Sequence, residues 1–424
     1  MTYTQSIDRP SVAVIGGGAA GLLAAGRLLE SGCRVTVFEH SRSVGRKLLI
    51  TGKGRCNLTN DCTREELLEN ITKNPRFLYS AFSNFSSADT MRLFSEQLGV
   101  PLKTERGRRV FPVSDRSHDI VDALKRYARG AETVFEHVTG IARDEGGAVC
   151  GVVTQKAIRP FDAAILATGG KSYPLTGSDG SGYSIAEALG HTVTPIIPSL
   201  VPIICGGDIC SRLEGLSLRN VALTIRRGES GKEIYRDFGE LVFTSRGMSG
   251  PMILSASAHL RAPDISDLTA HIDLKPALDE KTLDARLRSD LEKYAKSDFV
   301  NSLTALLPSK LIRPFAEYTG ISLRKQAADI TREERRRILT CLKDFIIPIT
   351  SLGPIEEAVI TSGGVSVSEI SPADMMSKKC PGLFFAGEII DVDAYTGGYN
   401  LQIAFSTAAL AASGAAKFAA ARRN

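Results

Sequence analysis

Residues 12–21 of the chain read VAVIGGGAAG, and this stretch decides the fold of the region around it. Its first four residues are apolar, which is typical of a short strand buried in a parallel sheet. After the glycines, residues 22–31 have a helical pattern that stops at Gly32, and residues 34–39 (RVTVFE) are typical of a second strand. A strand, a helix and a strand in this order predict an α/β fold with a Rossmann-type domain.

The glycines between strand and helix have the G-x-G-x-x-G spacing of a dinucleotide-binding turn. Gly16 permits the tight turn, Gly18 lets a pyrophosphate approach the backbone, and Gly21 lets the helix pack close to the strand. Ala19 and Ala20 lie in the first turn of the helix, where unpaired N–H groups and a partial positive charge attract phosphate. The context therefore favours a bound dinucleotide over a glycine turn without a ligand.

The segment after the second strand indicates which dinucleotide is bound, FAD or NAD. Glu39 ends that strand and is placed to accept hydrogen bonds from the ribose hydroxyls of an adenosine. Residues 45–60 (GRKLLITGKGRCNLTN) then form a loop rich in glycine and cations, which suits a long, bent diphosphate cofactor such as FAD. The cofactor-binding residues that we expect in this loop are Arg46, Lys47, Gly52 and Asn57, although Arg46 and Lys47 could also be ordinary surface cations.

Five stretches of the chain together resemble the HI0933-like (YhiN-like) family of bacterial three-domain flavoproteins. They are VIGGGAAGLLAA at 14–25, GRKLLITGKGRCNLTN at 45–60, ATGGKSYPLTGSDGSGY at 167–183, TSGGV at 361–365 and GLFFAGEIIDVDAYTGGYNLQIA at 382–404. The resemblance covers nearly the whole chain and implies non-covalent FAD, an inserted β-barrel and a helical subdomain. In one departure, Ile403 stands where family members often carry Trp, and this chain has no Trp.

The last of these stretches is expected to hold the flavin. Gly387 and Glu388 follow a buried strand at 382–386, where a carboxylate can hold ribityl or ribose hydroxyls, and Asp391 is a second candidate. Gly398 lets the backbone pass close to the ring, next to Gly397. The residues that open the following helix, whose N–H groups can face the flavin, are Tyr399, Asn400, Leu401 and Gln402.

Three more segments are expected near the cofactor. Thr168 and Gly169 end a strand at 161–167 and are expected near the phosphates. Residues 361–365 are small enough to pass beside the flavin ring. Val138 resembles the position at which such families hold the adenine through a backbone group, whereas His137 beside it is expected to be a packed or surface histidine.

The sequence does not identify a catalytic residue. Tyr173 and Lys53 are the best candidates to face a substrate, and hydride transfer by a flavin needs no protein nucleophile. No metal site is expected, because the eight cysteines include no C-x-x-C pair. A redox disulfide between Cys56 and Cys62, or between Cys205 and Cys210, is an alternative to the reduced thiols that we expect.

A change of pattern after Pro195 predicts an insertion into the Rossmann-type domain. Residues 221–225 and 241–244 are typical of strands, whereas the pattern from 275 to 343 is helical. We expect three parts: a split, glutathione-reductase-like FAD-binding domain, a barrel and a helical subdomain. Their ranges are 1–193 with 356–424 for the FAD-binding domain, 194–274 with 344–355 for the barrel, and 275–343 for the helices.

The composition is that of an ordinary soluble protein, with 43% hydrophobic and 23% charged residues. A net charge of +5 is diffuse on 424 residues, so a nucleic-acid partner is not expected. The basic run at 332–337 contains both signs of charge and fits a solvated helix face.

The start of the chain lacks a signal-peptide pattern and the Ala-rich segment 407–421 fits a packed helix, so we expect a cytoplasmic protein without a membrane partner. The sequence is silent on the oligomeric state.

These features predict an FAD-dependent oxidoreductase that acts on a small molecule. The leading hypothesis is reduction of an activated C=C bond with NAD(P)H, which would enter transiently because no second glycine fingerprint exists. The resemblance supports it, since relatives include a reductase of unsaturated bile-acid intermediates. The alternative is an amine oxidase, because another relative oxidises aminoacetone with oxygen. A flavin-bound sensing protein that binds RNA through the insertion is a third reading, which the modest basicity argues against.

Overall fold

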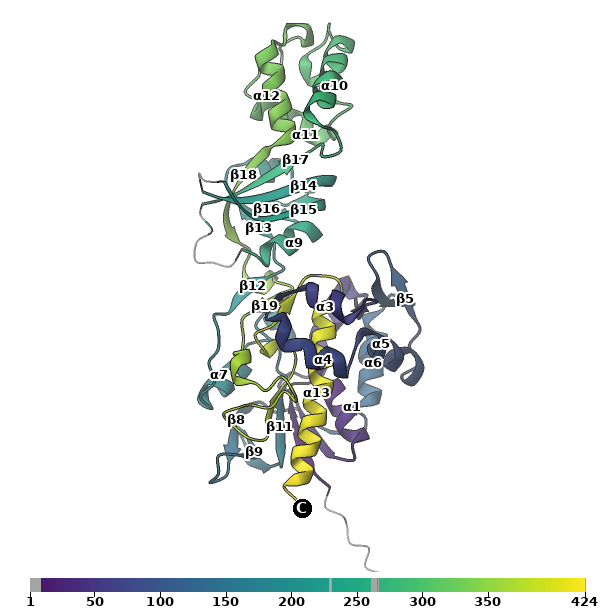
Figure 1. Cartoon of the computed structure of the whole chain (residues 1–424), viewed down its shortest axis with the longest axis vertical. Helices are drawn as coiled ribbons and strands as arrows, with labels where there is room; N and C mark the ends of the chain where they lie inside the picture. The colour runs from purple at the N-terminus through teal and green to yellow at the C-terminus, as the bar shows by residue number, and fades with distance from the viewer. Residues whose placement is uncertain (1–8, 229–230, 261–264, 266, 424) are drawn as a thin grey trace, which may run out of the picture. The chain divides into compact units, whose positions relative to one another are not determined.

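The computed structural model describes residues 9–228, 231–260, 265 and 267–423, and they form two compact units (Figure 1). Unit 1 comprises the chain up to Ser199 and again from Ile355, and unit 2 comprises Leu200–Pro354. Each unit has its own apolar core. The insertion begins later than the expected residue 194, because β12 (Ile197–Ser199) pairs with β19 (Ile360–Ser362) and so belongs to unit 1.

A five-stranded parallel sheet forms the centre of unit 1. Its order is β20 (Leu383–Phe385), β11 (Ala163–Leu166), β1 (Ser11–Ile15), β2 (Arg34–Phe38) and β7 (Glu132–Val134). The chain passes from β1 to β2 on one side and later adds β11 on the other, so the strand order reverses at β1. In such sheets a ligand crevice opens at the carboxyl ends of the strands beside the reversal. The predicted Rossmann-type fold is confirmed.

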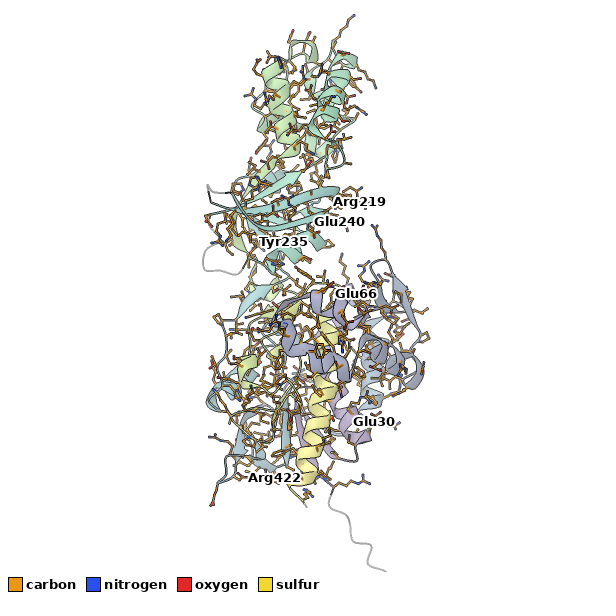
Figure 2. The ribbon with its side chains drawn as sticks, in the orientation of Figure 1. Glu30, Glu66, Arg219, Tyr235, Glu240 and Arg422 are labelled. Carbon is orange, nitrogen blue, oxygen red and sulfur yellow. The ribbon has the colours of Figure 1, made fainter. Side chains whose placement is uncertain are left out.

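Helices α1 (Ala19–Glu30) and α13 (Tyr399–Ala421) lie side by side against this sheet (Figure 1). By length and composition α13 could cross a membrane, but 67% of its most apolar window is buried within the protein. Phe405, Ala408 and Ala415 are fully buried there. Near its end, Arg422 forms an ion pair with Asp144 (2.5 Å), which fastens the helix to the neighbouring hairpin (Figure 2).

Smaller antiparallel sheets and short helices surround the parallel sheet of unit 1. The sheets are β8 (Val138–Arg143), β9 (Val149–Thr154) and β10 (Ile158–Pro160); β3 (Thr59–Asn60), β6 (Arg109–Pro112) and β5 (Leu102–Glu105); and β4 (Ile71–Lys73) with β21 (Asp393–Ala394). The helices are α2 (Arg46–Ile50), α3 (Arg64–Glu69), α4 (Tyr79–Asn84), α5 (Ser87–Arg92), α6 (Ser117–Tyr127) and α7 (Ser181–Ala188).

Unit 2 contains a closed antiparallel barrel, as predicted. Its order is β13 (Ile203–Cys205), β16 (Gly247–Ser249), β15 (Lys232–Phe243), β14 (Ser217–Arg227), β17 (Leu268–Asp273) and β18 (Phe345–Leu352). The barrel closes because β13 pairs with both β16 and β18. Alternate residues of β17 and β14 point into the core, which is the pattern that a barrel with one buried face requires. Helices α8 (Ile209–Arg212) and α9 (Pro251–Ser257) complete this part.

Three helices lie between β17 and β18 in the sequence and gather at one end of the barrel (Figure 1). They are α10 (Glu280–Lys293), α11 (Ser309–Tyr318) and α12 (Arg332–Lys343). The capping box expected at Thr331 is present: its hydroxyl accepts from the Glu334 N–H (3.2 Å), and the Glu334 carboxylate accepts from the Thr331 N–H (2.9 Å). Arg335 of α12 forms an ion pair with Asp284 of α10, with 2.8 Å between Nε and Oδ1.

Candidate cofactor and active site

The glycine turn of residues 16–21 requires glycine at Gly16 and at Gly21. Gly16 has a φ of +108°, and a Cβ there would overlap the carbonyl oxygen of Ala167. A Cβ on Gly21 would overlap the carbonyl oxygen of Gly16, so the helix and the strand approach closely at this point. Gly18, in contrast, faces open space and caps α1 without a side-chain hydrogen bond. The turn therefore presents bare backbone at the N-terminus of a twelve-residue helix.

Glu39 lies at the edge of this turn. Its carboxylate accepts hydrogen bonds from the Gly17 N–H (3.0 Å) and the Ser41 N–H (2.7 Å). The ring of His40 contacts that of His137, with centroids 5.7 Å apart, and this brings the start of β8 at Val138 to the same edge of the sheet. The fold thus gathers Glu39 and Val138 from distant parts of the sequence.

Lys47 and Glu388 form a polar node with Ser172 and Thr361, called here the Lys47–Glu388 node. The lysine Nζ contacts the glutamate carboxylate and the Ser172 hydroxyl, both at 2.7 Å. The other carboxylate oxygen accepts from the Ser172 hydroxyl (3.2 Å) and from the Thr361 N–H (2.8 Å). Lys47 and Glu388 were both predicted, whereas Ser172 was missed; its only signal is its place two residues after the Gly169–Gly170 pair.

Arg46 takes part in a different contact from its neighbour Lys47. Its guanidinium donates to the carbonyl of Leu175 (2.7 Å), so α2 is tied to the loop that follows β11. In this structure the Arg46 side chain therefore holds a loop of the protein. Its predicted contact with the cofactor stays a prediction.

The loop at 45–60 also meets the start of α13. The Asn57 amide, oriented to satisfy both neighbours, accepts from the Gly398 N–H (3.0 Å) and donates to the Thr59 carbonyl (3.2 Å). A Cβ on Gly398 would overlap the Thr59 carbonyl. A Cβ on Gly52 would lie 2.9 Å from the backbone nitrogen of Asn57. Close backbone approach explains the glycines at both positions.

Three predicted residues of the C-terminal segment use their side chains within the protein. Asp391 forms an ion pair with Lys73 (2.5 Å), a partner that the sequence did not suggest. Asn400 bonds the N–H and carbonyl of Ala394, which fixes the turn before α13. Gln402 is fully buried and bonds Thr59 (2.6 Å) among other neighbours. Leu401 and Tyr399 are partly exposed at the first turn of α13.

Buried hydroxyl groups without a partner lie among these residues. Thr168 Oγ1 follows β11, and Ser362 Oγ precedes Gly363 in the 361–365 stretch. The Tyr183 hydroxyl is a third case, and its pKa is raised by burial and by the negative charges of Glu388 and Asp391, so it remains a donor. Buried polar groups are nearly always hydrogen-bonded. These groups, together with the open turn at Gly18, fit a polar ligand of the kind that FAD is.

Both candidates for facing a substrate have a strained backbone. Lys53 has a φ of +59° between two glycines of positive φ, and Tyr173 has a φ of +53°. A residue other than glycine pays about 1–3 kcal/mol for such a conformation, and these residues concentrate at functional sites. Lys53 is exposed and Tyr173 is half-buried.

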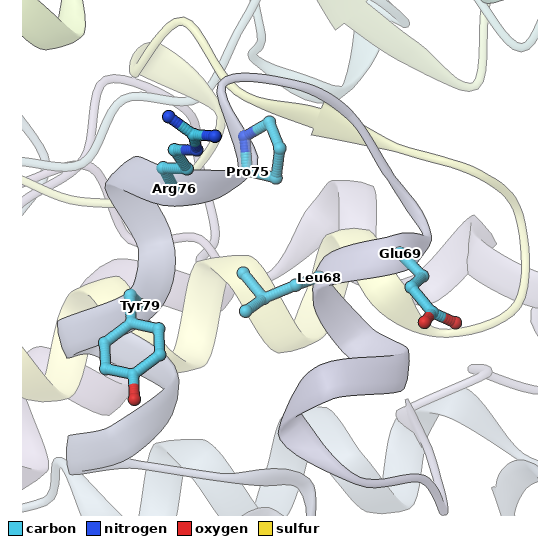
Figure 3. Close-up of a pocket in the computed structure, with 5 residues that line it drawn as sticks. All are labelled: Leu68, Glu69, Pro75, Arg76 and Tyr79. Atoms are coloured by element: carbon cyan, nitrogen blue, oxygen red, sulfur yellow. The ribbon is translucent and has the colours of Figure 1, made fainter.

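The cysteines and acidic residues suggest no other centre in the parts of the chain that the structure describes. All eight cysteines are free, and burial raises the pKa of the Cys56 thiol to about 12. Within the described ranges, no group of three His, Cys, Asp or Glu side chains could hold a metal ion. A hollow of about 420 Å³ lies between α3 and α4 (Figure 3). Its lining contains none of the predicted site residues: it consists of Leu68, Glu69, Pro75, Arg76 and Tyr79.

Taken together, the reversed strand order at β1, the open glycine turn and Glu39 define a Rossmann-type dinucleotide-binding protein. The family model described as HI0933-like protein Rossmann domain matches residues 10–414. The chain belongs to this family of FAD-binding oxidoreductases.

Two relatives align over almost their full lengths. The 3-dehydro-bile acid delta(4,6)-reductase of Clostridium scindens is 28% identical over 414 residues, which cover 96% of this chain and 99% of the relative. The ribosomal RNA dihydrouridine synthase of Haemophilus influenzae is 31% identical over 403 residues, which cover 93% of this chain and 96% of the relative.

A solved structure supports the fold. The 3-ketosteroid delta1-dehydrogenase of Sterolibacterium denitrificans matches with a TM-score of 0.51 and 12% identity. The match covers 97% of this chain and 99% of that protein. At this identity the likeness shows a shared architecture.

Proposed function

We propose that this flavoprotein reduces an activated C=C bond, with NAD(P)H as the electron donor. The names of both relatives describe addition of hydrogen across a carbon–carbon double bond, in a bile acid and in uridine. The observation that carries the proposal here is that one unit combines a site fitted to a dinucleotide with two polar residues of strained backbone, Lys53 and Tyr173.

The residues that would hold FAD fall into two groups. The turn at 16–21 and Glu39 would bind the adenosine diphosphate half through backbone N–H groups and a carboxylate. The Lys47–Glu388 node, Thr168 and the first turn of α13 would bind the flavin half. When bound, FAD supplies hydride transfer between the nicotinamide and the substrate.

Reduction of a polarised C=C bond needs a proton as well as a hydride. Our candidates to donate it are Lys53 and Tyr173, because each carries an ionisable proton on a residue whose backbone has a positive φ. General acids of this kind contribute roughly 10²–10⁴-fold to a rate.

Anaerobic stopped-flow spectroscopy of the FAD-loaded protein tests the proposal. We expect NADH or NADPH to bleach the flavin absorbance, and a conjugated enone steroid or a uridine-containing RNA to restore it in the absence of oxygen. Dithionite reduction of the same sample verifies that the flavin is redox-active. Bleaching by a primary amine but by neither nicotinamide would replace the reductase with an amine oxidase. Failure of both acceptors to reoxidise the reduced flavin would contradict the proposal.

A further inference from the structure

Two of the cysteines of unit 2, Cys205 and Cys210, come together at one edge of the barrel. Cys205 ends β13 and Cys210 lies in α8, with only residues 206–209 between them. Gly207 in this turn has a φ of +76°, a conformation that favours glycine and lets the chain reverse. After the turn, α8 packs against β16, the strand that pairs with β13. The chain therefore returns to the strand that it has just left.

The side chains of both cysteines face the same part of the barrel core. Cys210 is 3% exposed and belongs to the apolar cluster that includes Ile203 and Met248. Cys205 stands two residues after Ile203, so it faces the same side of β13, and it packs against the same cluster. The two thiols are hydrogen-bonded to each other, and the Met248 N–H of β16 donates to the Cys205 sulfur. Side chains that converge in this way meet a condition for a disulfide that side chains pointing apart do not meet.

Cys56 and Cys62 of unit 1 show that nearness in the sequence does not produce such a contact. They are spaced similarly, yet the thiol of Cys56 is hydrogen-bonded to Thr51 and that of Cys62 to Ser87. Burial raises the pKa of these thiols to about 12 and about 11, which keeps both protonated and unreactive. Of the two disulfides that sequence spacing left as alternatives, the fold brings together the sulfurs of Cys205 and Cys210.

The contact also changes the acidity of this pair. The hydrogen bond between the thiols lowers the pKa of Cys210, whereas the same bond and burial raise the pKa of Cys205. The pair therefore loses its first proton more readily than a lone buried thiol and shares the second between its sulfurs. Cys205 is half-buried and Cys210 is buried, so a reagent in solution reaches the pair through Cys205.

We propose that Cys205 and Cys210 are a redox-active dithiol that a small-molecule disulfide, such as oxidised glutathione, converts to a disulfide. The Cys205 sulfur attacks one sulfur of the reagent, whose S–S bond breaks and releases the first thiol. The Cys210 thiolate then attacks the Cys205 sulfur, which forms the protein disulfide and releases the second thiol. Two electrons pass from the protein to the reagent, and the two cysteine protons end on the released thiols.

The position of the disulfide gives it a structural consequence. It would join α8 covalently to the end of β13, and the pairing of β13 with both β16 and β18 is what closes the barrel. A cross-link at a closed loop restricts the unfolded chain and stabilises the folded one. Oxidation should therefore stabilise the barrel of unit 2 without involving the cofactor site of unit 1.

Peptide mass spectrometry of the full-length, FAD-loaded protein tests the proposal. The protein is incubated with oxidised glutathione, its free thiols are blocked with iodoacetamide under denaturing conditions, and it is cut with trypsin. Residues 172–212 form one tryptic peptide, whose cysteines are Cys205 and Cys210. We expect this peptide to carry no block and to be lighter by two hydrogen atoms than the reduced peptide. Two of the eight free thiols should be lost, and dithiothreitol should restore both.

Single substitutions test the order of the two steps. Cys210→Ser should stop at the mixed disulfide, so that its peptide gains one glutathione on Cys205, whereas Cys205→Ser should keep Cys210 free. Cys341→Ser is the matched control, because it removes another half-buried thiol of unit 2 and should leave the disulfide intact.

Three outcomes would overturn the proposal: a wild-type peptide with two free thiols after oxidation, a disulfide from Cys205 or Cys210 to a different cysteine, or loss of the disulfide in Cys341→Ser. The wild-type measurement needs no variant to fold. It also needs no turnover, so its failure is separable from failure of the reductase, which the stopped-flow test reports alone.

Discussion

Unit 1 and unit 2 differ in where their functional information lies. In unit 1 it lies in backbone conformation and in contacts between distant segments: Gly52, Lys53, Gly54 and Cys56 all have positive φ, and the Lys47–Glu388 node joins the two ends of the chain. Unit 2 contains none of the predicted cofactor residues, and its ion pairs join helices to one another, as Arg335 of α12 joins Asp284 of α10 (2.8 Å). A cofactor of fixed shape requires a rigid backbone cradle, which only unit 1 offers among the described residues.

The largest expected effect tests the rigid backbone of unit 1. A Gly21→Ala variant places a methyl group on the Gly16 carbonyl, so α1 must move away from β1. We expect purified protein without bound FAD and a free energy of unfolding lower by roughly 3 kcal/mol. The absorbance of the flavin and a denaturant titration measure both. Gly146→Ala is the control: this glycine of unit 1 has no positive φ, and a Cβ there would meet only Asp144 Oδ1 at 3.4 Å, so the variant should keep FAD. A Gly21→Ala protein with full FAD content would contradict this account of the turn.

The next effect concerns the two residues with a strained backbone that could face a substrate. If Lys53 or Tyr173 donates the proton, Lys53→Met or Tyr173→Phe should slow reoxidation of the flavin by a C=C acceptor roughly 10²–10⁴-fold. Bleaching by the nicotinamide should be unchanged, because that step needs no proton from the site. Stopped-flow traces of both half-reactions separate the two. Lys171→Met removes an exposed cation from the same loop as Tyr173 and should behave as the wild type; rates unchanged in both variants would remove these residues from the mechanism.

A smaller effect is expected at the Lys47–Glu388 node. Lys47 and Glu388 are 22% and 21% exposed, so breaking their pair leaves a partly buried charge without its partner. Lys47→Met should weaken FAD binding roughly tenfold, and the Lys47→Met/Glu388→Gln double variant should show a coupling free energy of about 0.5–3 kcal/mol. Titration of apoprotein with FAD measures both quantities.

The pair Lys156–Glu136 is the matched control for this node, since its lysine is 76% exposed in the same unit. Lys156→Met should leave FAD binding unchanged. Additive effects of the two node substitutions would show that the contact contributes nothing to the cofactor site.

The smallest expected effect is on the thermal midpoint, and it concerns a capping box that occurs once in each unit. Glu66 of unit 1 completes a capping box with Thr63, and Glu334 of unit 2 completes one with Thr331 (Figure 2 labels Glu66). A hydrogen bond from Arg108, then one from the Thr63 N–H, lowers the pKa of Glu66 to about 2; Lys325 and the Thr331 N–H lower the pKa of Glu334.

A lowered pKa in the folded state means that each carboxylate stabilises the protein above its ordinary value of 4.5, and that this contribution is lost as the pH falls toward the folded-state pKa. Glu66→Gln and Glu334→Gln should therefore lower the thermal midpoint by roughly 2 °C at neutral pH, and the difference from wild type should vanish near pH 2. Calorimetry at several pH values checks this. A difference that grew on acidification would show that the ion pairs do not stabilise either helix.

Sequence patterns predicted several local elements of both units well. The strand at Ser11–Ile15, the helix at Ala19–Glu30 and the capping box at Thr331 all follow from short-range periodicity and from side chains that bond their own backbone. The short antiparallel sheets, such as β3 with β6, were not predicted, because strands of two or three residues carry no periodicity of their own.

The candidate site was predicted in part. Glycine positions and acidic residues at strand ends mark Gly16, Gly21 and Glu388 in the sequence itself. The contacts of Asp391 with Lys73, of Lys47 with Ser172 and of Gln402 with Thr59 could not be predicted. They join segments far apart in the sequence, and nothing local in either segment specifies the other.

The sequence by itself determined the class of fold and the dinucleotide turn of this protein, because the glycines at 16–21 satisfy a local steric requirement that few other residues can meet. Only the tertiary structure decided which charges are neutralised. Lys47 forms an ion pair with Glu388, and Arg335 forms one with Asp284. Arg332, Arg336 and Arg337, which lie on the same helix as Arg335, form no ion pair with a carboxylate among the described residues. Net charge is a property of composition, but the pairing of charges depends on distances of a few ångströms that folding alone sets.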